Sequence, residues 1–553
     1  MLSTSRSYTS HSAIFKICVA AMNEIREIEI VFLLLLLFII VFGLLARRLG
    51  TPYPIVMVVG GLLLGFVPGI PGITLNPDLV FLVVLPPLLY AAAWKTSWRD
   101  FKYNLVTILL LAFGLVGFTV AAVALVAPSV LHGFDWRLGL VLGAVVAPTD
   151  AIAATSIARR IGLPSRIVDI LEGESLINDA SGLLTLQFAT AIVVRNHVPA
   201  LSRGILTFVW LIVGGIGLGL VVGWLVYFIE SRINDGPIEI ALSILTPYAT
   251  YFAAEQVQAS GVLAVVACGL FLSRRSAIFF SPSVRIQAWS VWESLEFVLN
   301  GLVFVLIGLQ LPSIRASIPE YDLSTLLLNG AIFSVVLILI RLVWVFPGAG
   351  VSWLVRTRFL QQNERPPITQ HVFVIGWTGM RGVVSLAAAL ALPSLLMDGS
   401  PFPQRNLIVF LAFFIICVTL ILQGVTLPPL IRSLKLAGAV GPSCEELEAR
   451  RIVIEAAVSY LQEARERDSK ESAAIYEDLT RLYYKRLAAL RSGDGYHEER
   501  AEYERYSGLS LEALRIERGT AIRLRDEGRI NDEVLRRLER ELDLSESQIA
   551  RIG

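Results

Sequence analysis

Long hydrophobic runs follow one another from residue 28 to residue 431, separated by short segments that contain glycine, proline and charged residues. A helix needs about 17 to 25 mostly apolar residues to cross the hydrocarbon core of a bilayer. The runs therefore predict thirteen membrane-spanning helices, several of them short or interrupted by glycine and proline. The expected segments are 28–46, 54–69, 78–93, 104–127, 137–157, 167–194, 204–229, 237–254, 260–273, 288–311, 325–346, 367–392 and 406–431.

Basic side chains are unevenly distributed among the loops between these segments. One set of alternate loops contains most of the arginines and lysines, among them Arg47, Lys95, Arg159 and Arg356, whereas the opposite set contains few. Loops rich in Arg and Lys stay on the cytoplasmic side. A missing or extra helix would destroy the alternation. We therefore expect thirteen spans, with the N-terminus outside and the C-terminal tail inside.

Composition divides the chain into an apolar body and a charged tail. Hydrophobic residues make up 55% of the 553 residues, and 45 of the 93 charged residues lie after Val440. We expect an N-terminal extension over 1–27, a transmembrane domain over 28–435 and a cytoplasmic helical tail over 436–553. The extension contains a second candidate start at Met22. Two interpretations of the tail remain open: a regulatory or oligomerisation domain, and a solvated helical hairpin.

Ionisable residues inside the apolar segments are few and clustered. Because a charge near the bilayer centre is costly unless it has a partner or faces water, each one is a candidate functional residue. They lie in "VVAPTDAIAATS" (Thr149, Asp150), "LEGESLINDASG" (Glu174, Asp179), "ILIRLVWVF" (Arg341) and "GWTGMRGVVSLAAALALP" (Arg381).

The segment "GESLINDASG" predicts a polar helix face. Glu174, Ser175, Asn178, Asp179 and Gly182 recur at spacings of three and four residues, so they lie on one side of a helix. A buried carboxylate beside hydroxyl and amide oxygens can hold either a dehydrated cation or a proton. Competition for that one group would couple the movements of the two ions. The alternative is a carboxylate that an arginine neutralises merely to hold helices together.

Glu174 and Arg341 are predicted to form that kind of structural pair. Glu174 lies about one turn from Asp179 and would repel it without a cation nearby, and Arg341 is isolated in a very apolar segment. Removing a single charge from water without a partner is strongly unfavourable. We therefore expect an ion bridge between them, which leaves Asp179 as the exchangeable site.

Two segments predict broken helices. Pro148 interrupts the fifth span near Thr149 and Asp150, and three glycines surround Arg381 in the twelfth. Transporters use such breaks, in corresponding places of two inverted repeats, to present carbonyls and helix ends to ions. Thr149 would offer an oxygen ligand, and Asp150 and Arg381 would offset the helix dipoles. Ordinary glycine-mediated helix packing is the alternative.

Motifs of other membrane protein classes are missing from the sequence. It contains no GxxxxGK[ST] phosphate loop, no TVGYG-like filter and no ladder of arginines at every third position. These observations argue against ATP drive, a selective channel pore and a voltage sensor. We expect a transporter without enzymatic activity or cofactor, whose partners are monovalent cations, protons and membrane lipid, with no nucleic acid.

Four motifs over about residues 28 to 435 resemble the sodium/proton exchanger family of NhaP- and NHE-type cation:proton antiporters. They are "LPPLLYAAAW", "APTDAIA", "GESLINDASG" and "GMRGVVSLAAALALP", in the order found in that family. The pair Asn178-Asp179 is similar to that of the electroneutral branch. The resemblance implies an all-α homodimer of thirteen-helix protomers with two inverted six-helix repeats. It also implies a transport core near 104–194 and 325–431, and a dimerisation part near 28–93 and 204–311.

The resemblance also implies a role for each matched residue. Asp179 would carry the cation or the proton, with Ser175 and Thr149 as further cation ligands. Asn178 would be its uncharged neighbour, Asp150 would belong to the broken-helix motif, and both would be part of the ion- and proton-binding site. Glu174 and Arg341 would form the core ion pair.

Several functional points remain open in the sequence. The expected activity is electroneutral exchange of Na⁺, K⁺ or Li⁺ for H⁺ across the plasma membrane, for pH and cation homeostasis. The alternatives are a membrane ion sensor that signals through its tail, and an ion channel. Many relatives have a glutamate where this chain has Ala91, and Glu293 and Glu296 are either gating residues or interfacial ones.

Overall fold

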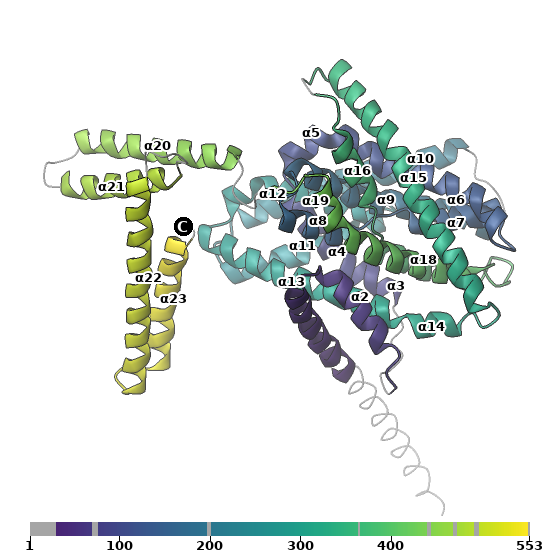
Figure 1. The fold of residues 1–553 in the computed structure, drawn as a ribbon, viewed down its shortest axis with the longest axis horizontal. Coiled ribbons are helices and arrows are strands. Elements are labelled where there is room, and N and C mark those ends of the chain that lie inside the picture. The colour runs from purple at the N-terminus through teal and green to yellow at the C-terminus, as the bar shows by residue number, and fades with distance from the viewer. Residues whose placement is uncertain are drawn as a thin grey trace, which may run out of the picture. The chain divides into compact units, whose positions relative to one another are not determined.

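The computed structural model describes residues 29–68, 76–195, 201–362, 365–438, 444–467, 473–490 and 497–550. Within these ranges the regular secondary structure is entirely helical, apart from one isolated β-bridge between Leu395 and Pro401. The chain divides into two compact units, Met1–Val440 and Gly441–Gly553. Both are drawn in Figure 1. The N-terminal extension expected over 1–27, with its candidate start at Met22, lies outside the described residues.

The first unit begins with a helix over Glu29–Leu49. The helices that follow it are α2 (Tyr53–Leu64), α3 (Pro77–Leu79), α4 (Leu85–Lys95), α5 (Trp98–Leu109), α6 (Val116–Val130), α7 (Trp136–Val146), α8 (Ala151–Ile161), α9 (Ser165–Arg195), α10 (Leu201–Glu230), α11 (Gly236–Gln256), α12 (Gly261–Phe279), α13 (Pro282–Leu309), α14 (Leu311–Ala316), α15 (Leu323–Arg358), α16 (Thr369–Trp377), α17 (Val383–Leu390), α18 (Arg405–Val418) and α19 (Gly424–Ser433).

Helix occupies most of the described residues in each of the thirteen expected segments. Within the described ranges, nine helices are long and apolar enough to cross a membrane. An all-helical fold with several apolar spans is therefore confirmed for the described part of the chain. The exact count of thirteen and the inverted repeats stay predictions.

Some helices extend well beyond their expected ends. Helix α15 continues through Pro347 to Arg358, although its apolar segment was expected to end at residue 346. An internal proline removes one backbone hydrogen bond, and helices that pack against neighbours tolerate this loss. The turns after Pro347 are held by such contacts, since Ser352 on this helix bonds the hydroxyl of Thr107 on α5 at 2.7 Å.

Three short π-helical segments interrupt the regular helices, at Val80–Val84, Leu110–Leu115 and Thr419–Gln423. The first precedes Pro86 and Pro87, which have no N–H to donate to carbonyls one turn earlier. The hydroxyl of Tyr248 instead donates to the Val83 carbonyl at 3.1 Å. In the second segment the Trp344 indole donates to the Leu110 carbonyl at 3.2 Å. Side chains of other helices thus satisfy carbonyls that these irregular segments expose.

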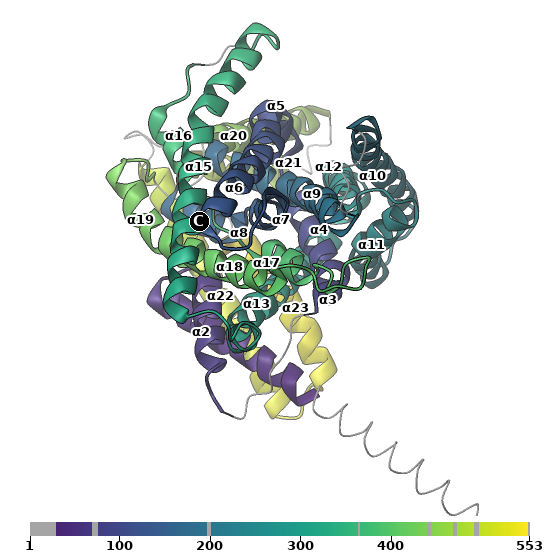
Figure 2. The same cartoon turned by 90° about the vertical axis from the view of Figure 1, so that its right-hand side faces the viewer.

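Two broken helices cross beside α9. Residues 147–150 are not helical between α7 and α8, and residues 378–382 are not helical between α16 and α17. The N–H of Asp150 donates to the carbonyl of Met380 at 2.8 Å, so the two unwound segments are in direct contact. Helix α9 packs against α7 and α8, and Figure 2 shows these helices surrounded by others.

The described residues of the second unit form four helices: α20 (Cys444–Arg467), α21 (Ala473–Leu490), α22 (His497–Asp526) and α23 (Asp532–Ala550). They pack in sequence, α20 on α21, α21 on α22 and α22 on α23. A small apolar cluster of Ile454, Val458 and Leu487 joins the first two. Exposed ion pairs also join neighbouring helices, such as Arg465 with Glu477 at 2.6 Å.

Candidate functional site

The break between α7 and α8 follows directly from its sequence. Pro148 has no N–H to donate and disfavours helical geometry at the residue before it. The carboxylate of Asp150 accepts a hydrogen bond from the N–H of Ile152 at 2.8 Å and caps the start of α8. The guanidinium of Arg381 donates to the carbonyl of Ala147 at 2.9 Å and to that of Pro148 at 3.5 Å. Each broken end therefore faces a charge of the sign that complements its dipole.

Small residues allow the two broken helices to approach closely. A Cβ atom on Gly382 would overlap the side chain of Asp150, and one on Gly182 would overlap the ring of Pro148. The N–H of Arg381 donates to the Thr419 hydroxyl at 3.1 Å, which fixes the second unwound segment to the last long helical stretch. The crossing is thus packed without room for larger side chains.

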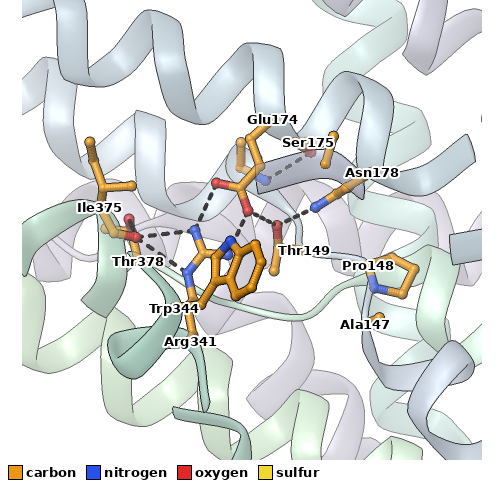
Figure 3. A network of polar contacts seen from close by, with 12 residues as sticks. Ala147, Pro148, Thr149, Glu174, Ser175, Asn178, Arg341, Trp344, Ile375 and Thr378 are labelled. Carbon is orange, nitrogen blue, oxygen red and sulfur yellow. Dashed lines mark hydrogen bonds and ion pairs between the residues drawn. The ribbon is translucent and has the colours of Figure 1, made fainter. Parts of the chain in front are cut away.

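Glu174 and Arg341 form a bidentate ion pair in the interior, shown in Figure 3. The two guanidinium nitrogens lie 2.5 and 2.8 Å from the two carboxylate oxygens. Arg341 also donates to the carbonyl of Ile375 at 3.1 and 3.3 Å. Only 2% of Arg341 and 1% of Glu174 are exposed. Because both charges are buried, paired and further hydrogen-bonded, this pair ties α9, α15 and α16 together.

A chain of hydrogen bonds leads from this ion pair to the unwound segment. The hydroxyl of Thr149 donates to a carboxylate oxygen of Glu174 at 3.1 Å, and the Asn178 amide donates to that hydroxyl at 2.5 Å. Figure 3 shows Thr149 between the two side chains. The amide oxygen of Asn178 is buried and has no hydrogen-bond partner in the described part of the chain. An acceptor without a partner at this place suits a cation or a proton donor.

Asp179 faces a cavity of about 320 Å³ on another side of α9. Its side chain is 9% exposed, and no described residue gives it a hydrogen bond. The same cavity is lined by Thr149, Asp150 and Ser175, and the Ser175 hydroxyl accepts a hydrogen bond from the N–H of Ala151 at 3.3 Å. The structure therefore brings Thr149, Ser175 and Asp179, the predicted cation ligands, to one cavity.

Two ion pairs line this cavity. Lys95 of α4 pairs with Glu296 of α13, and Arg159 of α8 pairs with Glu172 of α9 at 2.6 Å. The four charges sum to zero, and most of the remaining wall is apolar. Lys95 and Arg159 belong to the basic loops expected on the cytoplasmic side.

The sequence missed several of the lining residues. Glu172 follows the same helical register as Ser175 and Asp179, so the spacing alone contained a signal for it. Tyr53 of α2 and Asn300 of α13 also line the cavity, but nothing in their local sequence indicated this.

Other predicted residues occupy different positions. Ala91 is buried and lies outside the described cavity lining, which includes its neighbour Ala92. Arg381 lies outside the described lining and donates hydrogen bonds to the carbonyls of Ala147 and Pro148. Glu296 lines this cavity, whereas Glu293 lines a second one.

Comparison with known proteins gives consistent matches along the chain. The family described as "Sodium/hydrogen exchanger, transmembrane" matches residues 31–433. The uncharacterised Na⁺/H⁺ exchanger YjcE of Escherichia coli is 32% identical over 94% of this chain and 98% of its own length. The sodium, potassium, lithium and rubidium/H⁺ antiporter of Bacillus subtilis is 33% identical over 73% of this chain and 61% of its own. The solved structure of the sodium proton antiporter MjNhaP1 from Methanocaldococcus jannaschii superposes with a TM-score of 0.58 at 18% identity, covering 75% of this chain and all of that one.

Proposed function

Because this chain belongs to the sodium/hydrogen exchanger family, we propose that it exchanges one monovalent cation for one proton across the cell membrane by alternating access. The observation that carries the proposal is the contrast within α9. Asp179 faces a cavity and has no hydrogen-bond partner among the described residues, whereas Glu174, little more than one turn earlier, is paired with Arg341. Of these two carboxylates, Asp179 is therefore the one that can bind and release an ion.

Asp179 binds either ion in this scheme. A Na⁺ ion that loses its water at the end of the cavity needs several oxygen ligands. The carboxylate of Asp179 supplies the charge, and Ser175 and Thr149 line the same cavity. A proton bound to Asp179 removes that charge and the cation leaves. Competition for one group forces the two ions to move in turn.

Asn178 sets the charge balance of the exchange. Its amide is neutral and donates to Thr149, so it adds no second negative charge beside Asp179. The site therefore carries the same net charge whether it holds Na⁺ or H⁺. Membrane voltage, which does work of about 2.3 kcal/mol per elementary charge per 100 mV, would then contribute nothing to the cycle.

The other buried charged residues around the site have structural roles in this proposal. Glu174 and Arg341 hold three helices together, while Asp150 and Arg381 complement the broken ends. We assign the moving transport core to about 104–194 and 325–431, and the dimerisation part to about 28–93 and 204–311. The protein would be a homodimer of thirteen-helix protomers, with its N-terminus outside and the helical tail in the cytoplasm, serving pH and cation homeostasis.

The names of the relatives bear on cation choice. All those compared are Na⁺/H⁺ exchangers by name, and the relative from Bacillus subtilis is named for sodium, potassium, lithium and rubidium. We therefore take Na⁺ as the principal substrate, with K⁺ and Li⁺ as further candidates. In this proposal neither a cofactor nor ATP takes part, and the ions themselves are the substrates.

The test is proton flux in liposomes that contain the purified protein. A pH gradient should drive uptake of Na⁺, and protein-free liposomes should show none. Clamping the membrane potential with a potassium ionophore, in a series with constant K⁺, should leave the initial rate unchanged. A rate that follows the imposed voltage would contradict the one-for-one stoichiometry. Ion binding without flux would favour an ion sensor, and sustained current would favour a channel.

A further inference from the structure

A second, larger cavity of about 1250 Å³ lies beside the first. One wall belongs to the helix Glu29–Leu49, to the start of α2 and to α13, and the other belongs to α8 and α19. The proposed exchange site does not include this cavity. It lies between the helices assigned above to the dimerisation part and those assigned to the transport core.

Three arginines give this cavity a positive charge. Arg47, Arg160 and Arg432 line it, each from the last turn of its helix, and Glu293 is the one described carboxylate in the lining. None of the three has an ion-pair partner in the part of the chain that the structure describes. Arg160 donates to the carbonyl of Gly50 at 2.7 Å, which holds its side chain beside the start of α2. Guanidinium groups in this arrangement suit a phosphate, which accepts two hydrogen bonds from each.

Part of the cavity lining is apolar and exposed. Ile40 and Leu44 line it and are 55% and 58% exposed, on a helix whose hydropathy suits a bilayer. Phe297 and Val298 continue the wall on α13. Exposed apolar side chains on a helix of membrane-spanning length suit contact with acyl chains. The cavity therefore joins a basic rim to an exposed apolar surface.

We propose that this cavity holds one anionic phospholipid. Its phosphate would bind Arg47, Arg160 and Arg432, and its acyl chains would lie along Ile40 and Leu44. A soluble phosphate would use the rim alone and leave the apolar wall uncovered. A zwitterionic lipid would bring its own cation toward three arginines. An anionic headgroup attached to hydrocarbon matches both halves of the cavity.

The lipid also has a consequence for transport, which rests on the proposed function. It would contact α8 and α19 on one side and the helix Glu29–Leu49 on the other, so it would hold the two parts in their present relation. Lipid binding itself is independent of that function and is tested without measuring exchange.

The experiment is native mass spectrometry of the full chain purified in detergent and titrated with phosphatidylglycerol or phosphatidylcholine. We expect one phosphatidylglycerol retained per chain at concentrations where phosphatidylcholine is lost. The double substitution Arg47→Gln with Arg432→Gln should weaken its retention at least about tenfold, because two charged hydrogen-bond donors are removed. Glycerol phosphate, which lacks acyl chains, should not bind measurably.

The matched control is Arg274→Gln with Arg358→Gln, two exposed arginines outside the cavity. This variant should retain phosphatidylglycerol as the unmodified chain does. Equal retention of both lipids, or equal loss in the two double variants, would overturn the proposal. So would a second copy of the chain that protects this face without lipid.

Photoactivatable phosphatidylglycerol gives a measurement that does not depend on any variant. Labelling of the unmodified chain should fall on peptides that contain Ile40–Leu44 and Phe297–Val298. Labelling spread evenly over the lipid-facing helices would contradict a specific site.

Discussion

Glu174 and Asp179 are carboxylates on the same helix, little more than one turn apart, and the fold gives them opposite surroundings. Glu174 is 1% exposed, paired with Arg341 and hydrogen-bonded by Thr149. Asp179 is 9% exposed, lines a cavity and receives no hydrogen bond from a described residue. The difference teaches that the partners around a carboxylate, and not its type or its depth along a helix, separate a structural charge from an exchangeable one.

Asp179→Asn removes the proposed exchangeable carboxylate and has the largest expected effect. Cation-driven proton flux in liposomes should fall to the level of protein-free liposomes, because the amide neither binds a proton nor neutralises a cation. The unfolding temperature in detergent should not fall, since no described residue donates a hydrogen bond to this carboxylate. Asp169→Asn, on the same helix but outside the cavity lining, is the control. Full activity of Asp179→Asn would refute the assignment.

Glu174→Gln removes the structural carboxylate that pairs with Arg341. Removing one partner leaves Arg341 buried with an uncompensated charge, which costs about 3 to 5 kcal/mol. We expect a clear drop in thermal stability, measured by unfolding in detergent. Combining it with Arg341→Met should recover part of the loss, because the unpaired charge is gone. Glu172→Gln, which removes a partly exposed partner of Arg159, should leave stability almost unchanged. Similar losses in the two glutamine variants would contradict the contrast.

Gly382→Ala tests whether close packing at the crossing supports both carboxylates. The added methyl group would overlap the side chain of Asp150, and such overpacking costs about 1 to 3 kcal/mol. Both stability and exchange rate should decrease. Gly117→Ala is the matched control, because a Cβ atom there meets no atom within 4 Å. If the two alanine variants unfold at the same temperature, the crossing has more room than the structure indicates.

Glu296→Gln has the smallest expected effect. It tests whether a partly exposed carboxylate in the cavity lining contributes to cation binding. The pair with Lys95 is partly exposed, with 29% of the lysine side chain and 19% of the glutamate side chain accessible, so its loss costs about 0.2 to 1 kcal/mol. We expect a modest rise in the KM for Na⁺, because one carboxylate near the cavity is removed, with little change in unfolding temperature. Glu293→Gln, one turn earlier and outside this cavity, should not change KM. A complete loss of exchange in Glu296→Gln would make this residue part of the ion site.

Local sequence was sufficient for features that depend on composition and helical period. Apolar runs of membrane length predicted helix where the structure has it, and four motifs predicted the family that the comparisons confirm. The glycines around Arg381 and the proline before Thr149 predicted the unwound segments at 147–150 and 378–382. The reason is that hydrophobic length, proline geometry and glycine content act within one or two turns of the chain.

The end of α15 and the division of the polar face of α9 could not be predicted from local sequence patterns. The helix end expected at residue 346 was wrong because contacts with α5 extend α15 to Arg358. The polar face of α9 looked uniform in sequence, yet Glu174 and Asn178 point to Thr149 and Arg341, while Ser175 and Asp179 line the cavity. Its division depends on which helices pack on either side.

The sequence by itself determined that this chain is a helical membrane protein of the sodium/hydrogen exchanger family, and it restricted the candidate ion site to a handful of polar residues. It determined this because burying ionisable groups in hydrocarbon is so costly that each one stands out. Only the tertiary structure decided that Glu174 meets Arg341 and that Asp179 faces a cavity. It also decided that Tyr53, Lys95, Glu296 and Asn300 come from distant segments to line that cavity. These relations join residues far apart along the chain, and packing alone sets the distances between them.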